Sequence, residues 1–129
     1  MRAGDELGPI AYRVTREDLV AYAAASGDQN PIHQDEAIAL AVGLPGVIAH
    51  GMYTMALAAR AVDEWAGAPG RIGEIGVKFT KPVVVPAEGT EVSVAAVVSA
   101  VEGGAATLRL EVTCAGEKVL GAATAVLLG

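Results

Sequence analysis

The alternation of apolar and polar residues is clearest in the second half of the chain. Residues 107–114 place Leu, Leu, Val and Cys at every second position, with Thr, Arg and Glu between them. That is the pattern of a strand with one buried and one exposed face. Three further segments predict strands: 75–80, 92–101 and 119–128. The last of these is apolar on both faces, as expected of a central strand or of one covered by a partner.

The first half of the chain predicts helices after one weakly alternating strand at 10–15. Thr15 has the chemistry of a helix N-cap, because acidic residues follow in the first turn and apolar residues then recur at helical spacing. Ser26-Gly27 ends this helix. Residues 35–42 predict a second, short helix that ends at Gly43.

The strongest helix signal covers residues 51–65. This segment is apolar on nearly every side until Arg60, so we expect it to be buried, with Met52 and Met55 filling the core. One buried helix followed by long antiparallel strands predicts an α+β fold in which a curved sheet wraps around the helix. The length of 129 residues fits a single domain, 1–129.

Small side chains dominate the composition. The chain has 26 Ala and 16 Gly but only one Phe and one Trp. A core built from such residues buries little area per residue, so a second subunit would help to stabilise it, and we expect a homodimer. The 53% hydrophobic and 19% charged residues exclude a disordered chain.

Charge and hydropathy exclude several partners. The net charge is −6, with no cluster of Lys and Arg, so we expect no nucleic acid partner. No apolar run approaches the roughly 18 residues of a membrane span, so we expect no membrane partner. The polar N-terminal residues predict no signal peptide, and we expect a cytoplasmic protein. Cys114, in an alternating segment, is expected to be buried and unreactive.

Asp28 and His33 form the densest group of reactive side chains. The segment between them contains Asn-Pro and is irregular, so an Asp and a His five residues apart can converge on one point. Histidine exchanges protons near neutral pH, and a neighbouring carboxylate can orient it or share a bound water with it. Spacing alone also allows structural roles, with Asp28 as a turn residue and His33 as a hydrogen-bonded core residue.

Gly51 opens the predicted long helix and offers a backbone N–H at the positive end of the helix dipole. An oxygen that gains negative charge could be held there, and the missing Cβ permits close approach. His50 is expected to cap or pack against this helix. Asp28, His33, Asp35 and His50 could in principle bind a metal ion, but their spacing matches no established ligand pattern, so we expect no metal.

These residues resemble the signature of the MaoC-like, or R-specific hydratase, family. The similarity covers residues 22–33 (YAAASGDQNPIH), Ala39, and residues 49–52 (AHGM). The resemblance implies a hot-dog fold, an antiparallel sheet around a long helix, usually paired into a dimer. The chain is also similar to the catalytic subunit of bacterial (3R)-hydroxyacyl-ACP dehydratases, which makes a heterodimer with a second hot-dog subunit an alternative to the homodimer.

The resemblance implies reversible hydration of trans-2-enoyl thioesters of CoA or acyl carrier protein to (3R)-3-hydroxyacyl thioesters, in fatty acid or polyketide-type metabolism. By position, Asp28 and His33 would be the acid/base pair that holds the catalytic water. The Gly51 N–H would bind the thioester carbonyl oxygen. Asn30 would support the loop and, with His50 and Gly51, complete the substrate-binding set. No cofactor is expected, because the thioester acidifies its own α-carbon.

Two other functions remain open from the sequence. The first is a hot-dog acyl-thioesterase, because one fold supports several reactions. The second is a non-catalytic acyl-binding subunit of a heterodimer. Thiol release would reveal a thioesterase, and activity that requires a second hot-dog protein would indicate an obligate heterodimer.

Overall fold

The computed structural model describes all 129 residues as an α+β fold. The strands are β1 Glu6–Val14, β2 Ile72–Phe79, β3 Thr90–Glu102, β4 Ala105–Cys114 and β5 Glu117–Leu127. The helices are α1 Arg16–Ser26, the 3-10 helix η1 Pro31–His33, α2 Glu36–Ala41 and α3 Gly51–Ala66. The strands form one antiparallel sheet in the order β1-β3-β4-β5-β2.

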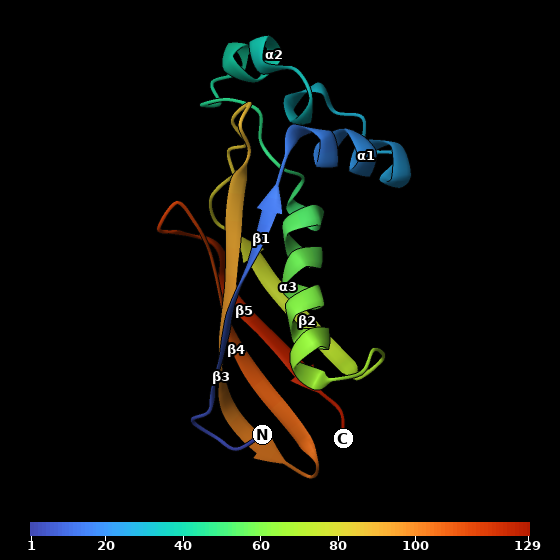
Figure 1. The fold of residues 1–129 in the computed structure, drawn as a ribbon, viewed down its shortest axis with the longest axis vertical. Helices are drawn as coiled ribbons and strands as arrows, with labels where there is room; N and C mark the ends of the chain where they lie inside the picture. Colours follow the sequence, from blue (N-terminus) through green and yellow to red (C-terminus); the bar gives the residue numbers. More distant parts are fainter.

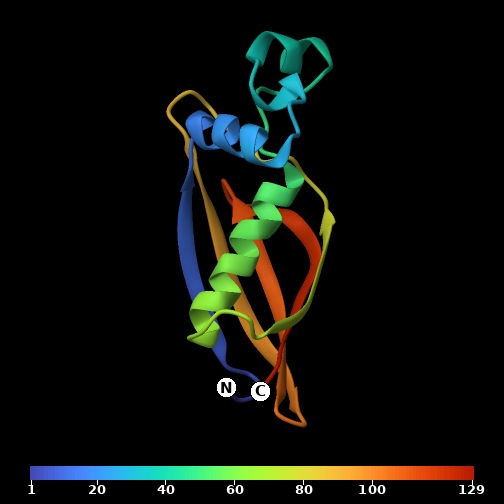
Figure 2. The same ribbon diagram turned by 90° about the vertical axis from the view of Figure 1, so that its right-hand side faces the viewer.

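The sheet curves around α3, which lies lengthwise against one of its faces (Figures 1 and 2). The helices α1 and α2 lie together at one end, beside the N-terminus of α3 (Figure 1). This is the hot-dog arrangement that the resemblance implied, so the expected fold is confirmed. Its consequence for the site is that the start of α3, the end of β2 and the loop after α1 meet at the same end of the molecule.

The inner face of the sheet forms the core, and it follows the predicted alternation. Val94 of β3 pairs with Val112 of β4, and Val98 pairs with Leu108. These four side chains are at most 1% exposed. Cys114, at the end of the same series, is buried and free, as expected.

The first strand and the long helix differ from expectation. β1 begins at Glu6 rather than at residue 10, because Gly8 and Pro9 interrupt the alternation, and the pairing with β3 shifts register there. The prediction that α3 is buried on every side, with Met52 in the core, is wrong. The sheet covers only one face of the helix, and the Met52 side chain is 58% exposed. No helix of this chain combines the length and the apolar character that a membrane span requires.

The start of α1 is fixed by the N-cap expected at Thr15. Its hydroxyl accepts a hydrogen bond from the Asp18 N–H, and the Asp18 carboxylate accepts one from the Thr15 N–H, at 3.2 and 2.9 Å. This reciprocal pair is a capping box, which satisfies two backbone donors of the first turn. At the other end, Gly27 adopts φ 81°, a left-handed conformation that ends the helix and directs the chain into the Asp28 loop.

We expect Thr15→Ala to lower the free energy of unfolding by about 1 kcal/mol, because the Asp18 N–H loses its bonded partner, whereas the backbone N–H of residue 15 can still donate to the Asp18 carboxylate. Urea denaturation measures this change, and Thr15→Ser, which keeps the hydroxyl, serves as the matched control. Equal midpoints for the alanine variant and the wild type would contradict the capping argument.

Candidate active site

A series of short side-chain hydrogen bonds shapes the loop after α1. The Asp28 N–H donates to the Ser26 hydroxyl at 3.1 Å, and the Asn30 N–H donates to the Asp28 carboxylate at 3.2 Å. The Asn30 side-chain carbonyl then accepts from the Ile32 N–H at 3.2 Å and caps η1. These are the local turns that Ser, Asp and Asn favour. The loop thus holds an exposed Asp28 carboxylate just ahead of His33.

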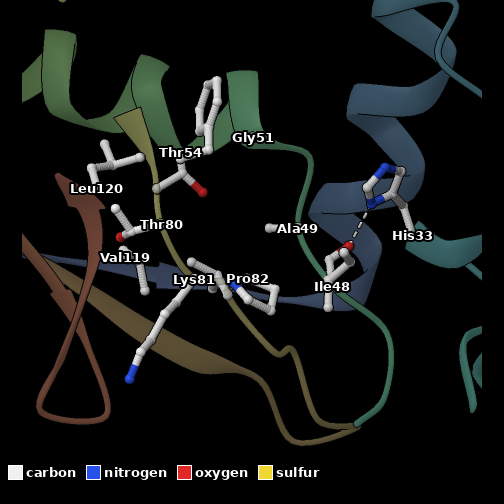
Figure 3. Close-up of a pocket in the computed structure, with 12 residues that line it drawn as sticks. His33, Ile48, Ala49, Gly51, Thr54, Thr80, Lys81, Pro82, Val119 and Leu120 are labelled. Atoms are coloured by element: carbon white, nitrogen blue, oxygen red, sulfur yellow. Dashed lines mark hydrogen bonds between the residues drawn. The ribbon is translucent and has the colours of Figure 1, made fainter. Parts of the chain in front are cut away.

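His33 is 7% exposed, and its orientation is set by the backbone. Its Nδ1 lies 2.7 Å from the Ile48 carbonyl oxygen (Figure 3). A carbonyl can only accept, so Nδ1 carries the proton and Nε2 keeps a free lone pair in the neutral ring. Ile48 is itself held in an isolated antiparallel bridge with Val84. The geometry therefore prepares His33 to take a proton at Nε2.

His50 lies behind His33 and links it to the Asp28 loop. The two imidazole rings stack with centroids 3.8 Å apart and planes inclined by 23°. The His50 side chain is 2% exposed, and its Nε2 donates to the Asp28 backbone carbonyl at 3.1 Å. Its Nδ1 is buried without a partner. Tyr22 packs against the other side, with ring centroids 4.8 Å apart.

Asp28, His33 and His50 each have one side-chain ligand atom within 4.8 Å of those of the other two. That separation suits a water molecule hydrogen-bonded to two of them, since two bonds of about 2.8 Å span up to about 5.6 Å. It suits a metal ion less well. Ring lone pairs lie in the ring planes, so two nearly parallel stacked imidazoles aim their nitrogens along similar directions rather than at one ion.

Gly51 presents an unpaired donor beside these groups. Gly51 is the first residue of α3, so its N–H has no acceptor within the helix, and it forms no hydrogen bond elsewhere in the chain. The Phe79 ring packs closely against this position. A Cβ here would lie 3.0 Å from Cε1 of Phe79, whose ring covers the start of α3.

Two cavities meet at Gly51 and Phe79. The first has a volume of about 260 Å³ and includes His33, Gly51 and Thr54 (Figure 3). Most of its remaining lining is apolar: Ile48, Ala49, Phe79, Pro82, Val83, Val119 and Leu120. The second, of about 430 Å³, includes Asp28, His50 and Gly51. The structure therefore brings four of the five sequence candidates to two adjoining cavities, whereas Asn30 lines neither and supports the loop.

Sequence reasoning missed three contributors to this site. Thr54 follows Gly51 by three residues, so helical spacing could have placed both on one face. The Ile48 carbonyl that orients His33 gives no sequence signal, because any residue type has one. Phe79 comes from a strand 28 positions after Gly51, and only the fold places it there.

Burial also affects a tyrosine in the first turn of α3. Tyr53 packs edge-on against Tyr22, with centroids 5.4 Å apart. Desolvation raises the pKa of the Tyr53 phenol, and the nearby Asp18 carboxylate raises this pKa further, while Arg60 opposes the effect. The phenol therefore stays protonated at neutral pH.

Comparison with known proteins places this site in a family. Residues 2–118 match the family described as "MaoC like domain". The chain is 41% identical over 75 residues to 3-hydroxyacyl-thioester dehydratase X of Mycobacterium tuberculosis, which is 58% of this chain but 26% of that protein.

Two solved structures are similar over almost the whole chain. A MaoC-like dehydratase superimposes with a TM-score of 0.96 at 37% identity, covering 99% of this chain and 40% of that one. The (R)-hydratase from A. caviae involved in PHA biosynthesis gives a TM-score of 0.87 at 26% identity, covering 100% and 98%. The chain thus spans less than half of the first relatives but nearly all of the (R)-hydratase. The sequence match and the shared fold together show that the chain belongs to the MaoC-like domain family.

Proposed function

We propose that the protein catalyses the reversible hydration of trans-2-enoyl thioesters to (3R)-3-hydroxyacyl thioesters. The observation that carries this proposal is the convergence of the Asp28 carboxylate, the free Nε2 of His33 and the unpaired Gly51 N–H at adjoining cavities. The names of similar proteins, a 3-hydroxyacyl-thioester dehydratase and an (R)-hydratase, support the same reaction.

In the hydration direction, Asp28 and His33 hold one water molecule between them. His33 Nε2 takes a proton from this water as its oxygen bonds to C3 of the enoyl chain. The π electrons move towards the thioester carbonyl, and the Gly51 N–H stabilises the charge that develops on its oxygen. A proton from the Asp28–His33 pair then completes the new C2–H bond. Dehydration follows these steps in reverse, and no step needs a cofactor.

His50 and Asn30 position the reacting residues. The stack on His33 and the bond to the Asp28 carbonyl let His50 set the spacing between the two acid/base groups. Asn30 does the same for the loop by capping η1. Their contacts favour positioning over direct substrate binding for both residues.

The first test is the ultraviolet absorbance of the conjugated enoyl thioester during incubation with crotonyl-CoA, a longer enoyl-CoA and an enoyl carrier protein. We expect the absorbance to decay while the thioester remains intact. Release of free thiol, measured in the same samples with a thiol reagent, would instead indicate an acyl-thioesterase. No decay with any of the three substrates would overturn the proposed reaction for this chain alone.

We also propose that two hot-dog domains pair in the active protein, with a homodimer favoured over a heterodimer. Met52 and Phe79 support this, because they are 58% and 57% exposed although both are large apolar residues beside the site. Light scattering during gel filtration should give twice the 13.0 kDa mass of the chain. A monomeric mass would contradict the homodimer, and activity gained on adding a second hot-dog protein would indicate the heterodimer.

A further inference from the structure

The first cavity contains a polar group that the proposed reaction has not used. Thr54 is 3% exposed, yet its hydroxyl points into the cavity rather than into the protein (Figure 3). The cavity side chains that form hydrogen bonds are His33, Thr80 and Lys81, and none of these bonds involves Thr54. The hydroxyl is therefore accessible from the cavity and is free to bond to a molecule that enters it.

The position of Thr54 on α3 relates it directly to the Gly51 N–H. Residues three apart lie on the same face of a helix, and a helical side chain leans towards the turn that precedes it. The Thr54 hydroxyl is therefore carried back over the first turn of α3, where Gly51 has no side chain to separate the two groups. Both residues line the first cavity, together with His33.

The surroundings of the hydroxyl strengthen any hydrogen bond it donates. The nearby lining is apolar, including Ala49, Val119 and Leu120 (Figure 3). Hydrogen bonds to a developing charge are stronger in such a setting than in water. A single backbone N–H leaves one lone pair of a carbonyl oxygen free, so a second donor has an acceptor available.

From these observations we infer that the Thr54 hydroxyl donates a second hydrogen bond to the thioester carbonyl oxygen, beside the bond from the Gly51 N–H. This inference rests on the proposed function, since it assigns another residue to the same substrate. The proton stays on Thr54 throughout, because the hydroxyl only stabilises charge that develops on the carbonyl oxygen.

The test compares Thr54→Val, which removes the hydroxyl and keeps the branched shape, with Thr54→Ser, which keeps the hydroxyl. We expect Thr54→Val to lower kcat for crotonyl-CoA hydration by about 10²-fold, the lower end for loss of one such donor, and Thr54→Ser to restore most of the activity. The control is Thr90→Val. Thr90 bonds to Cys114 at 3.4 Å and lines neither cavity, so its loss should leave kcat unchanged.

A spectroscopic readout separates this role from a structural one. Each hydrogen bond to a carbonyl lowers its stretching frequency, so isotope-edited infrared spectra of bound ¹³C-carbonyl crotonyl-CoA should show a higher frequency in Thr54→Val than in the parent. An Asp28→Asn background slows turnover during the measurement. If Thr54→Val does not fold, Thr54→Ala and Thr54→Ser provide the same comparison.

The outcomes distinguish the two proposals. An active wild type together with unchanged kcat and carbonyl frequency in Thr54→Val would overturn the role of Thr54 alone. A wild type that hydrates no enoyl thioester would overturn the proposed function, and the role of Thr54 with it. A lower kcat with an unchanged carbonyl frequency would also overturn the hydrogen bond, because Thr54 would then act through packing.

Discussion

His33→Ala should lower kcat/KM for enoyl thioester hydration by about 10²–10⁴-fold, the usual effect of removing an acid/base group. The residue is buried, and its Nδ1 bond to the Ile48 carbonyl leaves Nε2 as the only nitrogen free to move a proton. Asp28→Asn should give a loss in the same range. The amide keeps an oxygen that can accept from the Asn30 N–H, so the loop persists while the negative charge is lost.

The control for this pair is Asp35→Asn, which makes the same chemical change at a similar turn. The Asp35 carboxylate accepts from the Ile38 N–H at 3.2 Å and caps α2, and the residue lines neither cavity. We expect its hydration rate to equal that of the wild type. Steady-state kinetics on crotonyl-CoA measure kcat/KM for each variant, and circular dichroism verifies that each variant is folded. Full activity in both His33→Ala and Asp28→Asn would remove the acid/base assignment.

Gly51→Pro should lower kcat by about 10²–10³-fold, because it removes the backbone donor assigned to the thioester oxygen. At this position proline removes the backbone donor without disturbing the helix. Gly51 is the first residue of α3, where proline fits the helix and its missing N–H breaks no intrahelical bond. The preceding residue, His50, already has φ −59° and ψ 136°, within the region that proline tolerates before it.

Gly51→Ala is the control that separates loss of the N–H donor from the steric effect of an added side chain. It keeps the N–H but adds the same Cβ, which would lie 3.0 Å from the Phe79 ring. At this separation a shift of the Phe79 ring by a few tenths of an ångström accommodates the methyl group, so we expect only a few-fold loss of kcat. The thermal midpoint of each variant shows whether α3 still forms. Equal kcat values for the proline and alanine variants would show that the Gly51 N–H has no part in the reaction.

Local patterns predicted most of the fold. The Thr15 cap, the end of α1 at Gly27 and the alternation in β4 depend on neighbouring residues, so the sequence contains the information needed to place them. The predicted burial of Met52 failed because apolar character shows only that a side chain can be buried. Whether the sheet reaches that side of α3 is decided by the curvature and extent of the strands.

In the candidate site, too, local groupings could be predicted from the sequence and tertiary contacts could not. Asp28, Asn30 and His33 lie within one short loop, so the sequence and the family resemblance predicted that these residues lie close together. The stack of His33 on His50 joins residues 17 positions apart, and the Phe79 ring reaches Gly51 from another strand. Such contacts depend on tertiary packing, which no local pattern specifies.

The backbone acceptor for His33 has a consequence for how this protein tolerates sequence change. Many enzymes orient a catalytic histidine with a carboxylate, which one mutation can remove. Here the acceptor is a main-chain oxygen in a bridge between Ile48 and Val84. Every amino acid supplies that oxygen, so the identity of residue 48 can drift without loss of the required tautomer. Inactivating mutations should accordingly concentrate in the reacting groups themselves, and a library of all residue types at position 48 should retain function far more often than one at position 28 or 33.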